Sequence, residues 1–201
     1  MSKIGILGGT FNPVHNGHLH IAEQSANEFN LDRVIFVPSG LPPHKSTEDL
    51  APKEDRLRMV ELAVEGNPKF SVSRTEIDRS GFSYAVDTFN ELRREFGEEA
   101  ELYYIMGMDS INDILSWRKP LELFRLCKFI VATRPGSRVR TFNRLMKFPP
   151  IKENIKKINL IEVSLNISST DIRRNLKADQ VLDKFIPKKV IEYIKDKKLY
   201  K

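Results

Sequence analysis

Short apolar runs alternate with amphipathic helical patterns along this chain, and this alternation restricts the fold more than any other feature. Apolar runs typical of strands cover residues 4–7, 34–37, 70–72, 102–106, 129–132 and 158–163. Helical spacing of apolar residues covers 19–29, 54–65, 84–96, 121–126, 169–176 and 187–195. Repeated strand-then-helix order predicts an α/β, Rossmann-like, doubly wound and mainly parallel sheet with helices on both faces. Ligands of such sheets bind at the carboxyl ends of the strands.

Length and composition predict one compact domain over residues 1–201, because 40% hydrophobic residues supply a sizeable core. No apolar stretch reaches the length of a membrane helix, and Met1 leads into the first strand without a signal-peptide pattern. We therefore expect a soluble cytoplasmic protein with no membrane partner. Cys127 is the single cysteine, and its apolar surroundings predict a buried thiol and exclude an internal disulfide.

The chain is basic, with 33 Lys and Arg against 27 Asp and Glu, a net charge of +6. Such a charge suits nucleic acid or small polyanionic substrates equally well. Basic residues concentrate in 134–157, where Phe142 and Phe148 are the only aromatic residues. This shortage of stacking platforms favours a solvated loop with a short helix, and we expect no nucleic-acid partner.

A glycine turn and two histidines follow the first strand. Gly8 and Gly9 allow the backbone to approach a ligand, and His15 and His18 share one face of the next helix with Gly17 between them. The run is neither G-x-G-x-x-G nor a Walker loop. We expect a phosphate site here, and the alternatives are a capping or core histidine and, because H-E-x-x-H is absent, less favourably a metal site.

Other segments could complete a site but have ordinary structural explanations too. Ser169 or Thr170 could cap a helix whose N–H groups bind phosphate, with Arg173 one turn later. Asp109 could accept hydrogen bonds from ribose hydroxyls or cap a helix. Trp117 could stack on a base or pack in the core. Taken alone, local sequence favours a serine cap at Ser83 and a surface lysine at Lys45. The further candidates are Thr10, Phe11, His44, Tyr84, Ala85, Gly107, Arg134 and Ser168.

The segment GGTFNPVHNGH resembles the GGTFDPVHxGH motif of the nucleotidylyltransferase superfamily. Further matches follow in the order seen in bacterial nicotinate mononucleotide adenylyltransferases, at PPHK (42–45), SYAVDT (83–88), GMD (107–109), Trp117, RPG (134–136), ISSTDIR (167–173) and KLY (198–200). The resemblance spans almost the whole chain. It implies adenylyl transfer from ATP to nicotinate mononucleotide, giving nicotinate adenine dinucleotide and pyrophosphate in NAD biosynthesis.

The resemblance also implies roles for individual residues. His15, His18, Lys45 and Arg173 would be catalytic. ATP would contact Gly8, Gly9, Thr10, Phe11, His15, His18, Ser168, Ser169, Thr170 and Arg173. The mononucleotide would contact Thr10, Lys45, Ser83, Tyr84, Ala85, Gly107, Asp109, Trp117 and Arg134. Magnesium would arrive with ATP, since the motifs contain no carboxylate cage, and no metal ligand is assigned to the chain.

The chain departs from the family at two positions. Ala85 stands where the family usually has threonine, so the preference for the acid over the amide mononucleotide stays open, and Asn12 replaces the more frequent aspartate. The alternatives are a nicotinamide mononucleotide, phosphopantetheine or other adenylyltransferase of the superfamily, a noncatalytic nucleotide sensor, or a basic RNA-binding module. The sequence leaves homo-oligomerisation, loop closure and kinetic constants undecided.

Overall fold

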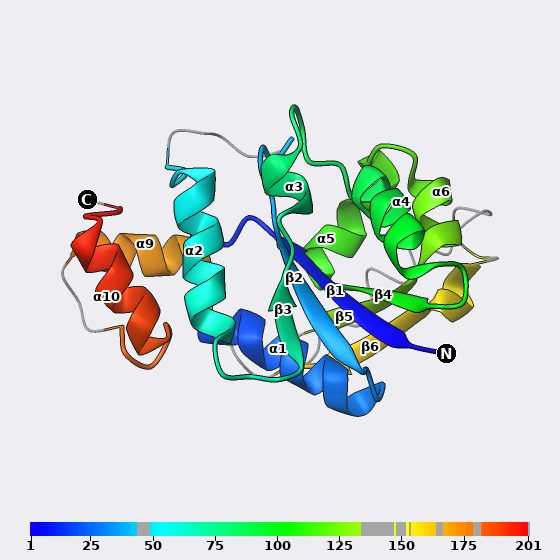
Figure 1. Cartoon of the computed structure of the whole chain (residues 1–201), viewed down its shortest axis with the longest axis horizontal. Coiled ribbons are helices and arrows are strands. Elements are labelled where there is room, and N and C mark those ends of the chain that lie inside the picture. Colours follow the sequence, from blue (N-terminus) through cyan, green and yellow to red (C-terminus); the bar gives the residue numbers. More distant parts are fainter. Residues whose placement is uncertain are drawn as a thin grey trace.

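A single parallel sheet organises the protein (Figure 1). The computed structural model describes residues 1–43, 49–133, 147, 152, 154–163, 167–178 and 182–200. The strands lie in the order β3-β2-β1-β4-β5-β6, and each neighbouring pair is parallel. Their bounds are β1 Lys3–Gly9, β2 Arg33–Pro38, β3 Phe70–Val72, β4 Glu101–Gly107, β5 Lys128–Thr133 and β6 Ile158–Glu162. The predicted Rossmann-like α/β fold is confirmed.

The helices predicted from apolar periodicity are present, with small shifts at their ends. They are α1 Asn16–Glu28, α2 Lys53–Val64, α4 Ala85–Phe96, α6 Pro120–Leu126, α9 Ser169–Lys177 and α10 Lys188–Asp196. Four short elements were not predicted, namely α3 Thr75–Asp78, α5 Met108–Asp113, and the 3-10 turns η1 Ile114–Ser116 and η2 Ile155–Lys157. Such short elements contain too few turns to produce an apolar periodicity.

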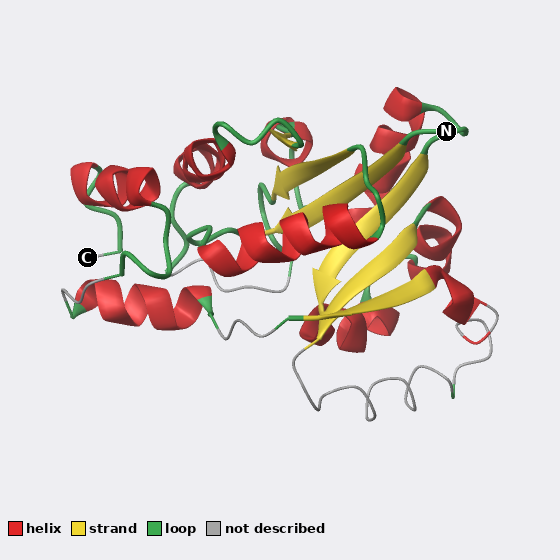
Figure 2. Cartoon of the chain, turned by 90° about the horizontal axis from the view of Figure 1, so that it is seen from below, coloured by secondary structure: helices red, strands yellow, loops and turns green. Residues whose placement is uncertain are grey.

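Side chains of the central strands alternate between two buried layers, so both faces of the sheet are covered. In β1, Ile6 belongs to the layer of α4, α5 and α6, whereas the adjacent Leu7 belongs to the layer of α1, α2, α9 and α10. Figure 2 shows helices on both sides of the strands. Cys127 is buried in the first of these layers, as predicted, and burial raises the pKa of its thiol.

The topology reverses direction at β1. The chain moves outward through β2 and β3, and then returns to the other side of β1 as β4. This reversal separates the loops that follow β1 and β4, and it opens a crevice at the carboxyl edge of the sheet. Gly8 and Gly9, which were expected to turn after the strand, are instead the last two residues of β1. This end of β1, the segment after Pro38 and the residues after Gly107 all meet this edge.

Two features of the sequence prediction lie partly or wholly outside the described residues. Most of 134–157, where a loop and short helix were expected, is among them, although η2 is described at its end. His44 and Lys45 also lie outside the described residues. In the described part of the chain, no helix is both long and apolar enough to span a membrane.

Candidate active site

The two histidines of the glycine-rich run lie against each other at the start of α1. His15 is the N-cap residue and His18 lies one turn later. Their rings stack with centroids 3.6 Å apart and planes inclined by 19°. The prediction that both imidazoles share one helix face is confirmed, and so is the alternative that a histidine caps this helix.

Reciprocal hydrogen bonds orient both rings. The backbone N–H of His18 donates to Nδ1 of His15 over 3.3 Å, and the backbone N–H of His15 donates to Nδ1 of His18 over 3.2 Å. A ring nitrogen that accepts a hydrogen bond carries no proton, so each neutral imidazole holds its proton on Nε2. Burial lowers the pKa of His15 from 6.5 to about 4, which keeps this ring neutral near pH 7. The pair therefore presents Nε2–H donors.

Glycine at position 17 makes room for this arrangement. A Cβ atom placed on Gly17 would lie 3.0 Å from Nδ1 of His15, tighter than ordinary contacts. The Phe11 ring supports the other histidine, with its centroid 5.0 Å from that of His18 in an edge-to-face contact. The backbone reaches this geometry through a positive φ of 49° at Phe11, a conformation that residues other than glycine seldom adopt.

The predicted second phosphate segment lies directly beside the first. The Ser169 hydroxyl donates to the carbonyl of Pro13 over 3.0 Å, and Arg173 donates to the carbonyl of Asn12 over 3.0 Å. The cap of α9 is Ser168, whose hydroxyl accepts from the N–H of Asp171 over 3.1 Å. Capping by Ser169 or Thr170 was therefore wrong, because the Ser169 hydroxyl instead ties α9 to the loop after β1.

Two buried side chains whose contacts the sequence did not indicate hold the loop after β1. The guanidinium of Arg56 is fully buried and donates to three backbone carbonyls, those of Thr10 at 2.8 Å, Gly40 at 2.9 Å and Ala51 at 3.0 Å. Its position on α2, a helix with many charged residues, gave no reason to expect burial. Arg56 joins the loop after β1 to the loop after β2 and to the start of α2.

Asn12 is the second such residue, and its structure explains why a neutral amide suits this position. Its Nδ2 donates to the carbonyl of Asp49 over 2.7 Å, a bond that a carboxylate could not make. Its Oδ1 accepts from the N–H of Ala51 and from the Tyr200 hydroxyl, over 3.0 and 2.8 Å. The C-terminal segment is thereby linked to the loop after β1.

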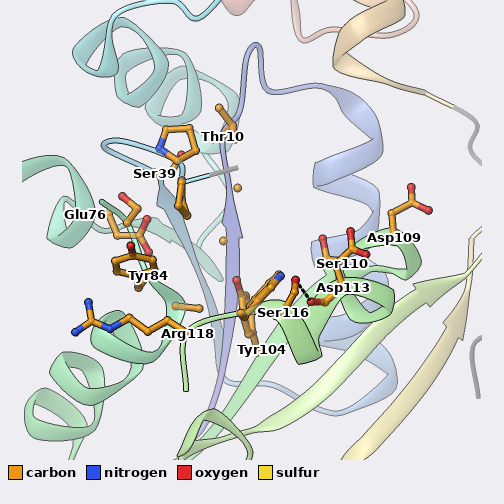
Figure 3. A pocket seen from close by; sticks show the side chains of 17 residues that line it. Thr10, Ser39, Glu76, Tyr84, Tyr104, Asp109, Ser110, Asp113, Ser116 and Arg118 are labelled. Atoms are coloured by element: carbon orange, nitrogen blue, oxygen red, sulfur yellow. Dashed lines mark hydrogen bonds between the residues drawn. The ribbon is translucent and has the colours of Figure 1, made fainter. Parts of the chain in front are cut away.

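A cavity of about 510 Å³ opens at the carboxyl edge of the sheet, beside the glycines that end β1. Figure 3 shows Glu76, Tyr84 and Arg118 on one side, Asp109 and Ser110 on the other, and Thr10 and Ser39 between them. Gly8, Gly9, Thr10, Ser83, Tyr84, Ala85, Asp109 and Trp117 were predicted and line it. Ser39, Pro42, Pro43, Glu76, Tyr104, Ser110, Asp113, Ser116 and Arg118 also line it, of which only Pro42 and Pro43 belong to the family motifs quoted from the sequence.

The structure decides several of the local alternatives. The Ser83 hydroxyl does not cap α4 but accepts from the N–H groups of Gly40 and Leu41, over 2.9 and 3.3 Å, while Tyr84 is the N-cap residue. Asp109 is exposed in the first turn of α5, whose N-cap residue is Gly107. Trp117 is partly buried against the core and also lines the cavity, so both of its suggested roles are compatible with its position.

The remaining predicted residues stand as follows. Phe11 is buried beneath the histidines, and Gly107 is exposed at the end of β4. Lys45 and Arg134 lie outside the described residues, so their predicted contacts are untested. His15 and His18 do not line the cavity themselves, although Thr10 of the same loop does. The histidine pair therefore lies outside the cavity, on the same loop as Thr10.

Comparison with known proteins identifies the family of this chain. Residues 6–175 match the family model described as cytidylyltransferase-like. A Moorella thermoacetica protein named "Probable nicotinate-nucleotide adenylyltransferase" is 48% identical over 200 residues, covering 99% of this chain and 92% of its own length. A Thermoanaerobacter protein of the same name is 43% identical over 201 residues, covering 99% and 94%. The chain belongs to the nicotinate-nucleotide adenylyltransferase family.

Solved structures show the same fold. The Plasmodium falciparum nicotinic acid mononucleotide adenylyltransferase described as complexed with NaAD superposes with a TM-score of 0.79 at 22% identity, covering 100% of this chain and 98% of that one. The same protein complexed with APC gives a TM-score of 0.77 at 21% identity, with the same coverage. Membership of this enzyme family, predicted from the motifs, is confirmed.

Proposed function

We propose that this chain transfers the adenylyl group of ATP to nicotinate mononucleotide, with ATP phosphates at the histidine pair and the acceptor in the cavity. The observation that carries the proposal is the reciprocal hydrogen bonding of His15 and His18. These bonds fix the orientation of the two Nε2–H donors at the start of α1. A helix start and fixed N–H donors together favour a phosphate group.

The reaction needs alignment and charge stabilisation more than a protein nucleophile. The 5′-phosphate of the acceptor is already anionic, and it attacks the α-phosphorus of ATP in line while the bond to pyrophosphate breaks. The Nε2–H groups of His15 and His18 would donate to the α- and β-phosphates without taking or giving a proton. Thr10 and the end of β1 at Gly8 and Gly9 would lie between the two polyanions. They would place the attacking oxygen opposite the leaving group.

The phosphates of ATP would extend toward α9. Its N–H groups at Ser169 and Thr170 begin the helix, and the Arg173 guanidinium lies beside the loop after β1 through its bond to Asn12. Nε of Arg173 is buried and has no hydrogen-bond partner among the described residues. We assign pyrophosphate stabilisation to Arg173 and, from the family motif, to Lys45.

The acceptor would lie with its ring between Tyr84 and Trp117 and its ribose toward Asp109. Tyr84 precedes α4, Asp109 belongs to α5 and Trp117 follows η1, and all three line the same cavity. The first N–H groups of α4, those of Ala85 and Val86, have no partner within the helix and would donate to the ring carboxylate. Backbone donors make this contact independent of the Thr to Ala difference at position 85.

A divalent cation would enter with ATP. The described residues contain no group of three or more His, Cys, Asp or Glu side chains that could hold a metal ion. We propose that the cation is Mg²⁺ carried by the triphosphate. Such an ion would supply charge neutralisation to the phosphates. The cytoplasmic location, the absence of nucleic-acid binding, the open question of self-association and the roles of Lys45 and Arg134 stay predictions.

Pyrophosphate release with ATP and nicotinate mononucleotide tests the proposal when His18→Ala is compared with His20→Ala. Loss of one transition-state donor should lower kcat by about a hundredfold or more. His20 belongs to the same helix but not to the stacked pair, so its variant should stay within about twofold of wild type. Equal turnover of the two variants would remove the histidine pair from the mechanism.

A further inference from the structure

Glu76 is a buried carboxyl group on the wall of the cavity, and the reaction described above does not use it. It belongs to the short helix α3 and is 8% exposed. Figure 3 shows it beside Tyr84, on the side of the cavity from which α4 begins. A carboxyl group removed from water in this way needs partners or a proton.

The partners of Glu76 place its carboxyl against the first turn of α4. The Thr88 hydroxyl donates to Oε1 over 2.6 Å, and Thr88 lies one turn into that helix. The nearby Ser83 hydroxyl also favours the ionised carboxylate and acts to lower its pKa. Burial raises the pKa of Glu76, and these hydroxyl groups oppose that effect only in part. Glu76 therefore occupies the helix end to which an anionic ligand would be drawn.

Most neighbouring cations already have partners. Arg79 pairs with Glu91 over 2.8 Å and donates to Thr88 over 3.2 Å. Arg118, whose guanidinium lies 4.8 Å from the Tyr84 ring centroid, pairs with Asp87 over 3.6 Å.

Two further groups act on this wall. Arg56 interacts electrostatically with Glu76 while donating to backbone carbonyls, and the buried Tyr104 phenol stays neutral because burial raises its pKa. The positive charge here is thus largely balanced before a substrate arrives. A second carboxylate beside an ionised Glu76 would meet repulsion.

We propose that Glu76 carries a proton when nicotinate mononucleotide is bound, and that this proton lets the cavity accept an anionic ring substituent. The inference rests on the proposed acceptor site at the start of α4. The proton comes from solvent on binding, and no bond of the substrate changes. An ionised Glu76 would instead accept a hydrogen bond from an amide, so the charge on this side chain sets the choice between acid and amide.

Binding constants of nicotinate and nicotinamide mononucleotide, measured by calorimetry between pH 6 and 9, test this inference. Both ligands carry the same phosphate, so the ratio of their Kd values isolates the ring substituent. For wild type, the ratio should shift toward the amide by up to tenfold per pH unit once free Glu76 ionises. Nicotinate mononucleotide should also take up a proton, seen as a dependence of the heat on the buffer.

Two variants complete the test. Glu76→Gln imitates the protonated side chain, so it should remove the pH dependence of the ratio and the proton uptake. Glu91→Gln removes a carboxylate of the same network that does not line the cavity, and it should keep both. A wild-type ratio that is constant over this range would overturn the proposal even if Glu76→Gln failed to fold. Normal synthesis of the dinucleotide with a constant ratio would reject only the role of Glu76, whereas no turnover of either mononucleotide would reject the proposed function.

Discussion

Replacing Arg56 with methionine should be the most damaging single change in the loop network beside the site. The guanidinium is fully buried, and its three hydrogen bonds all end on backbone carbonyls, at 2.8–3.0 Å. Burial lowers the pKa of Arg56, but the group remains a cation at any working pH because an arginine side chain ordinarily loses its proton only in strongly alkaline solution. The substitution keeps much of the side-chain volume and removes every donor.

The expected loss of stability follows from these contacts. Three hydrogen bonds to a charged group contribute about 1.5–3 kcal/mol each, but the variant no longer buries a charge, which recovers several kcal/mol. Leaving the three buried carbonyls without a donor costs about 1–3 kcal/mol each, and after this recovery we expect a net loss of about 3–5 kcal/mol. For a domain of this size the loss corresponds to a fall in Tm of roughly 6–20 °C.

Urea denaturation monitored by circular dichroism measures this loss, and Arg58→Met is the matched control on the same helix. Arg58 is 54% exposed and pairs with Glu61 over 3.0 Å, so its replacement should change the free energy of unfolding by less than about 0.5 kcal/mol. If Arg56→Met unfolds within about 1 kcal/mol of wild type, the three carbonyls do not depend on the guanidinium, and the argument for its organising role fails.

Three further predictions follow from individual contacts. His15 gains a proton below pH 6.5 in the unfolded chain but only below about 4 in the folded protein. The free energy of unfolding should therefore fall between these pH values, by about 2 kcal/mol at pH 5. Denaturation of His15→Asn should not show this part of the pH dependence. Gly17→Ala places a methyl group 3.0 Å from the His15 ring, so pyrophosphate release should drop by roughly tenfold or more, and full activity would show that the ring position is not critical. Gly40→Ala would bring a Cβ within 2.2 Å of the Glu76 backbone oxygen; thermal unfolding should reveal a loss of about 1–3 kcal/mol, and an unchanged Tm would mean that the loop moves freely.

The fold was predictable because its strands are apolar on both faces. Every predicted strand is present, and so is every helix predicted from apolar periodicity. The residues of β1 show why, since Ile6 and Leu7 enter opposite buried layers and leave no polar position in the run. The predicted start of α1 was less accurate. The helix starts at Asn16 because His15 supplies its cap, a role usually taken by Ser, Thr, Asp or Asn.

The site was predictable where a motif names its residues and less so where packing creates the contact. The pairing of His15 with His18 followed from helical spacing alone. In contrast, Arg56 and Glu76 read as ordinary surface charges until the fold buries them between elements distant in the sequence. Ser83 shows the intermediate case, since its position beside α4 was expected but its partners, the N–H groups of Gly40 and Leu41, depend on the loop after β2. Long-range contacts of this kind leave no local pattern.

The most direct test of the account is the product formed by the purified protein from ATP, Mg²⁺ and nicotinate mononucleotide. We predict one nicotinate adenine dinucleotide for each pyrophosphate released, both resolved by chromatography, with the reaction depending on His18. ATP binding without dinucleotide formation from nicotinate mononucleotide or its amide would contradict the account and leave a nucleotide-binding protein without this catalytic function.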